Sequence, residues 1–255
     1  MPPAPEILVH ETTYRKRNPV GWVHRNRLQA VAGVFARHLD SSIATWADFG
    51  CSNGFVIGEI VAQKRHPFRR IAGFDNTQEL IERARAKGIE RAEFDVFDLN
   101  VVRPATEKFD LVTCLETLEH VGNIHNAIAN LVERVRDGGL LVISVPNETG
   151  LPGFVKLVGR AIVRRNPYDD FFAEGGKARY VGRLLAYRRI DDFRKPTQGG
   201  YGPHLGFDYR TMQDHVRETY VKPGALVPCA REVTMLGMNV LLVYRKRATR
   251  PPDAR

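Results

Sequence analysis

A tight turn rich in small residues, within positions 47–58, constrains most strongly what this 255-residue chain can fold into. Apolar residues lead into the turn, Gly50 and Gly54 lie within it, and a helix-like apolar pattern follows from Val56. Glycine adopts backbone conformations that other residues avoid, and a helix that starts directly after a turn offers free N–H groups. The pattern predicts a strand, a loop and a helix that can hold a nucleotide-like ligand at the carboxyl edge of a parallel sheet.

Short apolar runs alternate with helical patterns through the first 150 residues. The run 140–145 is continuously apolar, which is typical of a strand buried on both faces of a parallel sheet. Strands and helices that alternate at this spacing predict an α/β, doubly wound domain. The strands are expected at 46–49, 71–75, 92–97, 109–115, 140–145 and 239–244, and the helices at 18–39, 56–64, 80–87, 124–135 and 209–218.

We expect one domain at 18–247, between a flexible arm at 1–17 and a tail at 248–255. Residues 150–203 interrupt the alternation and form a mainly helical insertion, with 11 Lys or Arg against 5 Asp or Glu. The segment 154–165 has an apolar stripe flanked by basic residues, which predicts a basic amphipathic helix. The stripe is expected to pack on the domain as a lid; a peripheral contact with membrane lipid or with an anionic substrate is the alternative.

Charge and cysteine content limit the setting in which the chain works. The formal net charge of +9 favours an anionic partner. Three cysteines, Cys51, Cys114 and Cys229, do not make a disulfide framework, so we expect a reducing compartment. The first residues lack the apolar centre of a signal peptide, and no run approaches the length of a membrane span. A cytoplasmic protein is therefore expected.

Two acidic residues follow the glycine turn, each at the end of a predicted strand. Asp75 ends the second strand, where a carboxylate can accept hydrogen bonds from both hydroxyls of a ribose. Asp98 ends the third strand, where a carboxylate can accept from the amino group of adenine. One such aspartate is more often a helix cap. Two in this order after a glycine turn indicate a nucleoside site.

Across residues 45–147 the chain resembles the class I S-adenosylmethionine-dependent methyltransferases. The resemblance implies a Rossmann-like, mostly parallel sheet of seven strands, with Asp75 at the ribose and Asp98 at the adenine. Ser52 departs from the glycine of many members, although a small residue still fits there. The matching motifs are Asp48–Gly54, Gly73-Phe74-Asp75, Phe94-x-x-x-Asp98, Phe109–Val112 and Asp137–Leu141. The cofactor residues implied are Asp48, Gly50, Cys51, Ser52, Asn53, Gly54, Asp75, Asn76, Asp98, Leu99 and Leu115.

The end of the fourth predicted strand carries the candidate chemistry. If Glu116 opens a helix there, Glu119 and His120 lie three and four residues on and share its face. Two carboxylates and an imidazole make half of a site for a divalent ion. A glutamate is also favoured at a helix start by the helix dipole alone, and a single histidine is often structural. Both interpretations stay open on the residues alone.

Two narrower resemblances favour the metal interpretation. The Glu-x-x-Glu-His run resembles that of the small-RNA 3′-end 2′-O-methyltransferases. The run from Thr113 to Val121 resembles that of the ubiquinone-biosynthesis O-methyltransferases. In both families a downstream histidine precedes an aromatic helix, and His204 occupies that place here. The implied metal ligands are Glu116, Glu119, His120 and His204; without a metal, His120 is the expected general base and Glu116 its catalytic partner.

The leading functional hypothesis is an O-methyltransferase acting on a small molecule or on a glycan or lipid intermediate. An RNA 2′-O-methyltransferase is the alternative, because RNA-binding proteins combine basic residues with aromatic platforms. A cofactor-binding protein without catalysis is the third hypothesis. The basic residues of the first helix, His24, Arg25 and Arg27, would cover the cofactor, meet an anionic acceptor or form a solvated face. The aromatic candidates for an RNA platform are Tyr168, Phe171, Phe172, Tyr180 and Tyr187.

Overall fold

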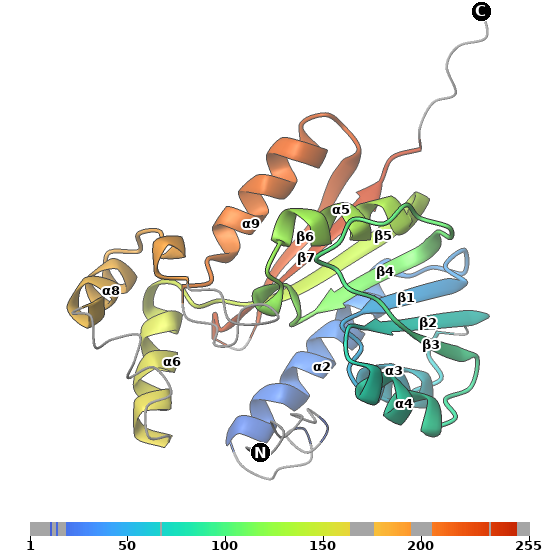
Figure 1. The fold of residues 1–255 in the computed structure, drawn as a ribbon, viewed down its shortest axis with the longest axis horizontal. Helices are drawn as coiled ribbons and strands as arrows, with labels where there is room; N and C mark the ends of the chain where they lie inside the picture. Colours follow the sequence, from blue (N-terminus) through green and yellow to red (C-terminus); the bar gives the residue numbers. More distant parts are fainter. Residues whose placement is uncertain are drawn as a thin grey trace, which may run out of the picture.

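A seven-stranded sheet with the order β3-β2-β1-β4-β5-β7-β6 forms the centre of the molecule (Figure 1). Strands β1 to β5 run parallel, and β7 and β6 are antiparallel additions at one edge. The strands are β1 (Thr45–Phe49), β2 (Arg70–Asp75), β3 (Ala92–Val96), β4 (Phe109–Leu115), β5 (Val135–Pro146), β6 (Leu226–Thr234) and β7 (Asn239–Lys246). The computed structural model describes residues 11, 14, 19–66, 68–163, 176–194, 206–234 and 236–248, without the side chains of 19, 20, 23, 24 and 161–163.

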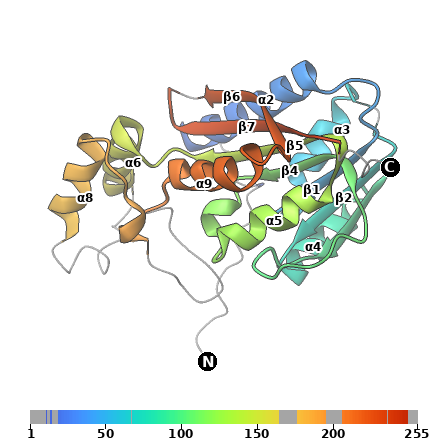
Figure 2. The same ribbon diagram turned by 90° about the horizontal axis from the view of Figure 1, so that it is seen from above.

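Helices cover both faces of this sheet, as the doubly wound prediction requires (Figure 2). On one face α2, α3 and α4 bury a core around Phe35, Trp46 and Ile57. On the other face α5 and α9 pack over Phe49 and Val112. The helices are α2 (Pro19–His38), α3 (Phe55–Ala62), α4 (Gln78–Ala86), α5 (Ile124–Arg134) and α9 (Tyr209–Val216).

Strand β6 was not predicted, because its residues lack the apolar pattern that marks the other strands in the sequence. β6 is the outermost strand, so only β7 pairs with it. Much of its surface is exposed, and it contains Pro228, which is tolerated at a sheet edge. Its residues therefore form neither an apolar run nor a strict alternation. Strand β5 also begins earlier than the predicted 140, at Val135.

In its described residues, the segment after β5 consists of helices joined by short non-helical connections. It contains α6 (Gly150–Val163), α8 (Gly176–Leu185) and a 3-10 turn, η2 (Asp191–Phe193), which stand beyond the end of β5 in Figure 1. Phe154 and Leu157 of α6 pack against a small core formed by Tyr180, Leu184, Ile190 and Phe193. These two residues pack within the insertion itself, and the expected packing of the stripe on the domain as a lid stays a prediction. Val158 is 41% exposed, and the side chains of residues 161 and 162 lie outside the described residues.

Two basic residues of α6 face inward rather than outward. Glu148 is 1% exposed, and it accepts from Lys156 at 3.2 Å and from both terminal nitrogens of Arg160 at 2.8 and 2.9 Å. These cations hold the start of the insertion on the sheet. Membrane contact through 154–165 stays a prediction, with two of its cations engaged inside the protein. No helix in the described part of the chain is long and apolar enough to span a bilayer.

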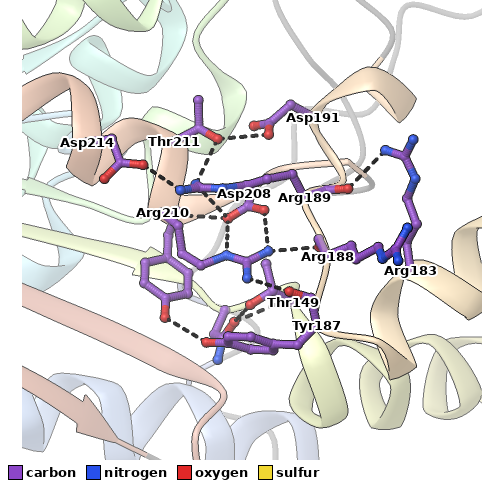
Figure 3. Close-up of polar contacts among 12 residues, drawn as sticks. Thr149, Arg183, Tyr187, Arg188, Arg189, Asp191, Asp208, Arg210, Thr211 and Asp214 are labelled. Atoms are coloured by element: carbon purple, nitrogen blue, oxygen red, sulfur yellow. Dashed lines mark hydrogen bonds and ion pairs between the residues drawn. The ribbon is translucent and has the colours of Figure 1, made fainter.

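The end of the insertion is fastened to α9 through Asp208, the N-cap of that helix (Figure 3). The carboxylate of Asp208 is buried and accepts from Arg210 Nε at 2.8 Å and Nη2 at 2.6 Å. The same guanidinium donates to the carbonyl oxygens of Tyr187 and Arg188, both at 2.8 Å. A bidentate pair of this kind fixes both partners in one geometry. It holds the return of the insertion close to the sheet edge.

Candidate functional site

The glycine turn lies where the sequence placed it, between β1 and α3. The amides of Gly50 and Cys51 both donate to the carbonyl oxygen of Phe74, at 2.7 and 2.9 Å, which fastens the turn to the end of β2. Gly50 has a φ of 80°, in the left-handed region that favours glycine. A Cβ at this position would lie 2.0 Å from Thr117 Oγ1, so the turn also touches the segment after β4.

The turn holds polar atoms that the described part of the chain leaves without hydrogen-bond partners. Ser52 Oγ and Asn53 Oδ1 are both buried in this state. Ser52 also has a φ of 51°, a conformation that costs a non-glycine residue energy. Buried polar atoms are nearly always paired. These two therefore indicate a polar ligand on the turn.

Asp75 and Asp98 lie at the same edge of the sheet. Asp75 ends β2, and its carboxylate accepts from the amides of Ser52 at 2.9 Å and Thr77 at 3.0 Å. Asp98 follows β3, and its Oδ1 accepts from the backbone and side-chain nitrogens of Asn100, both at 2.8 Å. Since a carboxylate offers about four lone pairs, both aspartates keep capacity for a ligand. The structure brings them together with the glycine turn.

The other predicted cofactor residues surround this edge at different depths. Leu99 belongs to the core and Cys51 is buried under the turn, while Leu115 is half-buried. Asn76 is exposed at the rim, and its side-chain oxygen accepts from Thr77 Oγ1 at 3.0 Å. Gly54 caps α3 with a φ of 72°. Their contact with a cofactor stays a prediction.

Asp48 lies beneath the turn with 3% of its surface exposed. The hydroxyl of Thr113 donates to its carboxyl group, and Trp46 Nε1 in turn donates to that hydroxyl at 2.8 Å. Burial raises the pKa of Asp48 to about 7, and the nearby charge of Asp75 acts in the same direction. Asp48 therefore takes up a proton near neutral pH and lies one strand away from the Asp75 carboxylate.

Glu116 does not open a helix, so this part of the sequence analysis was wrong. It has a φ of 52°, and a short 3-10 turn, η1 (Leu118–His120), begins only two residues later. Its amide donates to the carbonyl oxygen of Ser144 at 2.9 Å, which prolongs the strand pairing past β4. Its carboxylate forms an ion pair with Arg27 at 2.9 Å and accepts from Ser144 Oγ at 2.9 Å and Asn239 Nδ2 at 2.7 Å. Residues of α2, β5 and β7 thus hold the Glu116 side chain.

Glu119 has the opposite environment. It is completely buried, and neither carboxyl oxygen has a hydrogen-bond partner among the described residues. Burial raises the pKa of Glu119 well above its ordinary value, and the neighbouring Glu116 carboxylate raises it further. The direction of this shift favours the protonated form of Glu119. A neutral carboxyl group can both donate and accept a hydrogen bond.

The predicted metal shell is not assembled by the described residues. Among them, no three His, Cys, Asp or Glu side chains form a group able to hold a metal ion. His120 is half-buried in η1, and His204 lies outside the described residues. Glu116 already accepts from a guanidinium, an amide and a hydroxyl. This donor set does not fit a metal at Glu116, and the full shell stays a prediction.

Comparison with known proteins identifies the family of the chain. The family described as a methyltransferase domain matches residues 22–190, which include the turn, both aspartates and the segment after β4. The chain belongs to this family. A ubiquinone biosynthesis O-methyltransferase of Rickettsia akari (strain Hartford) is 28% identical over 124 residues, 48% of this chain and 47% of the relative. The chain thus spans about half the length of the curated relative it matches.

Two solved structures share the fold at low identity. The magnesium protoporphyrin IX methyltransferase from Synechocystis PCC 6803, with bound SAH, has a TM-score of 0.57 at 16% identity and covers 92% of each chain. The plantazolicin methyltransferase in complex with SAH has a TM-score of 0.61 at 11% identity, covering 93% of this chain and 89% of that one. Both neighbours bind SAH, the form that S-adenosylmethionine takes after its methyl group has been transferred. The unpaired polar atoms of the turn fit the methionine part of that cofactor.

The sequence did not predict the contacts of several residues at the site. Arg27 was expected to cover the cofactor, to meet an anionic acceptor or to lie on a solvated helix face, whereas its side chain is 14% exposed and paired with Glu116. Arg25 of the same face is exposed and donates to the carbonyl oxygen of Tyr14 at 2.9 Å, and the His24 side chain lies outside the described residues. Asn239 begins β7, which is remote from Glu116 in the chain. Only the antiparallel β5–β7 pairing brings it to the site.

Substitution of Asp75 tests the cofactor half of the site. We expect Asp75→Asn to raise the Kd for SAH by about tenfold or more, because a hydrogen bond to a charged group contributes roughly 1.5–3 kcal/mol. Asp95→Asn is the matched control, since Asp95 is exposed on the neighbouring strand. Isothermal titration calorimetry measures both variants. Equal Kd values for Asp75→Asn and the wild type would contradict the assignment.

The raised pKa of Asp48 predicts a pH-dependent stability. The folded state holds this proton up to about pH 7, while an unfolded aspartate releases it near its ordinary value of 3.8. Asp48 therefore lowers the free energy of unfolding as pH rises from about 4 to 7, by at most about 4 kcal/mol. In urea unfolding, Asp48→Asn is expected to gain stability relative to the wild type over this window. A constant difference between the two proteins from pH 4 to 8 would refute this.

Proposed function

We propose that this methyltransferase methylates a hydroxyl oxygen of a small molecule or of a glycan or lipid intermediate, and that the acceptor is anionic. The observation that best supports this proposal is the difference between the environments of two glutamates that follow β4. Glu116 is a carboxylate fixed by Arg27, whereas Glu119 is buried without a partner and its pKa is raised. Pairs of acids that differ in this way commonly divide the roles of acid and base in a site.

The unpaired carboxyl group of Glu119 supports a hydroxyl-bearing acceptor. A buried polar group without a partner costs about 1–3 kcal/mol, so its presence favours a ligand that completes its hydrogen bonds. A hydroxyl does so, since it donates one hydrogen bond and accepts others. The cofactor supplies an electrophilic methyl group on sulfur. The chain orients the acceptor oxygen toward it, and this positioning provides much of the rate enhancement.

His120 is our proposed general base. It lies in η1, directly after Glu119, and imidazole has an ordinary pKa of about 6.5, close to neutral pH. In this proposal His120 takes the acceptor proton, while Glu116 keeps the local charge and geometry fixed through Arg27 and Asn239. A divalent ion bound by Glu119, His120 and His204 is the metal-assisted version of the proposal. No step here requires it.

The insertion supports a compact acceptor. Arg194, next to η2, donates to the carbonyl oxygen of Glu119 at 2.8 Å and to that of Val121 at 3.3 Å. The end of the insertion thus lies against the segment that carries the candidate chemistry. The basic content of residues 150–203 gives an anionic group on the acceptor a complementary charge.

The aromatic residues do not strengthen the RNA alternative. Tyr180 is 1% exposed and belongs to the core of the insertion, so it cannot stack on a base. Tyr187 is exposed, but the Arg210 guanidinium lies over its ring, 4.4 Å from the centroid. Tyr168, Phe171 and Phe172 lie outside the described residues. RNA 2′-O-methylation is therefore a second outcome of the test.

The test uses methyl-labelled cofactor with fractions of an extract from the protein's own host. We expect label in the small-molecule or lipid fraction and not in RNA. Glu119→Gln keeps a neutral hydrogen-bonding group, so its kcat should fall less than about tenfold, whereas Glu119→Leu should lose about 100-fold. Glu82→Gln is the control, because Glu82 is exposed on α4.

Three outcomes would contradict parts of this proposal. Label only in RNA would overturn the acceptor class. Equal losses in Glu119→Gln and Glu119→Leu would overturn the neutral role of Glu119. Activity that EDTA abolishes and a divalent ion restores would replace the metal-free version with the metal-assisted one. Cofactor binding without label in any fraction would favour the non-catalytic hypothesis for this acceptor set.

A further inference from the structure

Glu11, which precedes the methyltransferase fold in the chain, contacts the glycine turn. Its Oε2 accepts from Asn53 Nδ2 at 3.0 Å and from Lys87 Nζ at 2.7 Å. Asn53 lies between the two glycines of the turn and is 3% exposed. Because its amide nitrogen points to Glu11, its amide oxygen is turned the other way. That oxygen is the buried acceptor without a partner.

Tyr14 packs on the start of α3, directly after the same turn. Its ring packs on Phe55, the first residue of α3, with centroids 4.8 Å apart. The guanidinium of Arg25 donates a hydrogen bond to the carbonyl oxygen of Tyr14 at 2.9 Å. The Lys87 ammonium group lies 5.6 Å from the centre of the Phe55 ring. Contacts from α2, α3 and α4 therefore converge on two residues at the N-terminal side of the fold.

Charged groups of the site act on the phenol of Tyr14. Burial raises the pKa of Tyr14, the positive charge of Arg27 opposes this, and the negative charges of Glu116 and Asp48 add to it. Asp48 lies at the end of β1 just before the turn, Arg27 lies on α2, and Glu116 follows β4. Tyr14 thus lies within electrostatic reach of three residues of the site.

We propose that Glu11 and Tyr14 complete the binding site for the methionine part of the cofactor. Glu11 orients the Asn53 amide so that Oδ1 accepts a hydrogen bond from the cofactor's α-ammonium group. Tyr14 forms the outer wall against the methionine chain. An ammonium group has only donors, so an acceptor that is already oriented and dehydrated suits it. The inference rests on the family's cofactor and is independent of the acceptor.

Two probes separate this role from a general structural one. SAH carries the amino-acid group, and 5′-methylthioadenosine has the same nucleoside without it. We expect Glu11→Ala and Tyr14→Ala each to raise the Kd for SAH by about tenfold, the effect of losing about 1.4 kcal/mol of binding free energy. Their Kd for 5′-methylthioadenosine should stay within about twofold of the wild type. Tyr220→Ala, a half-buried tyrosine on the opposite side of the sheet, is the control.

A double-mutant cycle tests the proposed chain of contacts. If Glu11 acts through Asn53, Glu11→Ala should weaken SAH binding far less in an Asn53→Ala background than in the wild type. The proposal is overturned if SAH and 5′-methylthioadenosine weaken equally, which would show a general loss of structure. It is also overturned if neither Kd changes, or if the effects of Glu11→Ala and Asn53→Ala add. A wild type that binds SAH but labels no acceptor would refute the proposed acceptor and leave this inference intact.

Discussion

The close approach of Gly50 to Thr117 joins the candidate cofactor site, at the ends of β1 and β2, to the segment after β4 that carries Glu116 and Glu119. A side chain at position 50 would overlap Thr117, so the turn after β1 can lie against the segment after β4 only because the residue is glycine. The two amides that donate to Phe74 hold the same turn on β2. Three strand ends are thereby fixed relative to one another. Asp75 and Asp98, which are assigned to the nucleoside, then lie at the same edge of the sheet as Glu116 and Glu119.

Burial controls the charge of this edge more than ion pairing does. Asp48 and Glu119 are both buried, and burial raises the pKa of each. Glu116 and Glu148 are held instead by arginine partners. The site therefore combines acids whose pKa is raised by burial with an acid that is held by an arginine. Such an arrangement suits the binding of a cationic cofactor next to an acceptor that must lose a proton.

The sequence predicted the parts of the site that follow from local pattern. The glycine turn, Asp75 and Asp98 were predictable because each lies at a strand end marked by an apolar run. Glu116 was placed at the right edge but in the wrong conformation, since its positive φ arises from the strand pairing with Ser144 and from contacts with Arg27 and Asn239.

The remaining features depend on contacts between distant residues. Glu11 and Asn53 are 42 positions apart, and Asn239 and Glu116 are 123 apart. No periodicity marks such pairs, because only the folded topology brings them together. The edge strand β6 was missed for a related reason. One of its edges is unpaired, so its residues carry little of the apolar pattern that burial imposes.

A crystal structure of the complex with SAH tests the central claim most directly. The account predicts ribose hydroxyls on Asp75, adenine beside Asp98, the methionine part on the turn from Gly50 to Gly54, and the sulfur facing Glu116. An SAH molecule bound elsewhere, or bound at this edge with its sulfur directed away from Glu116 and Glu119, would contradict it.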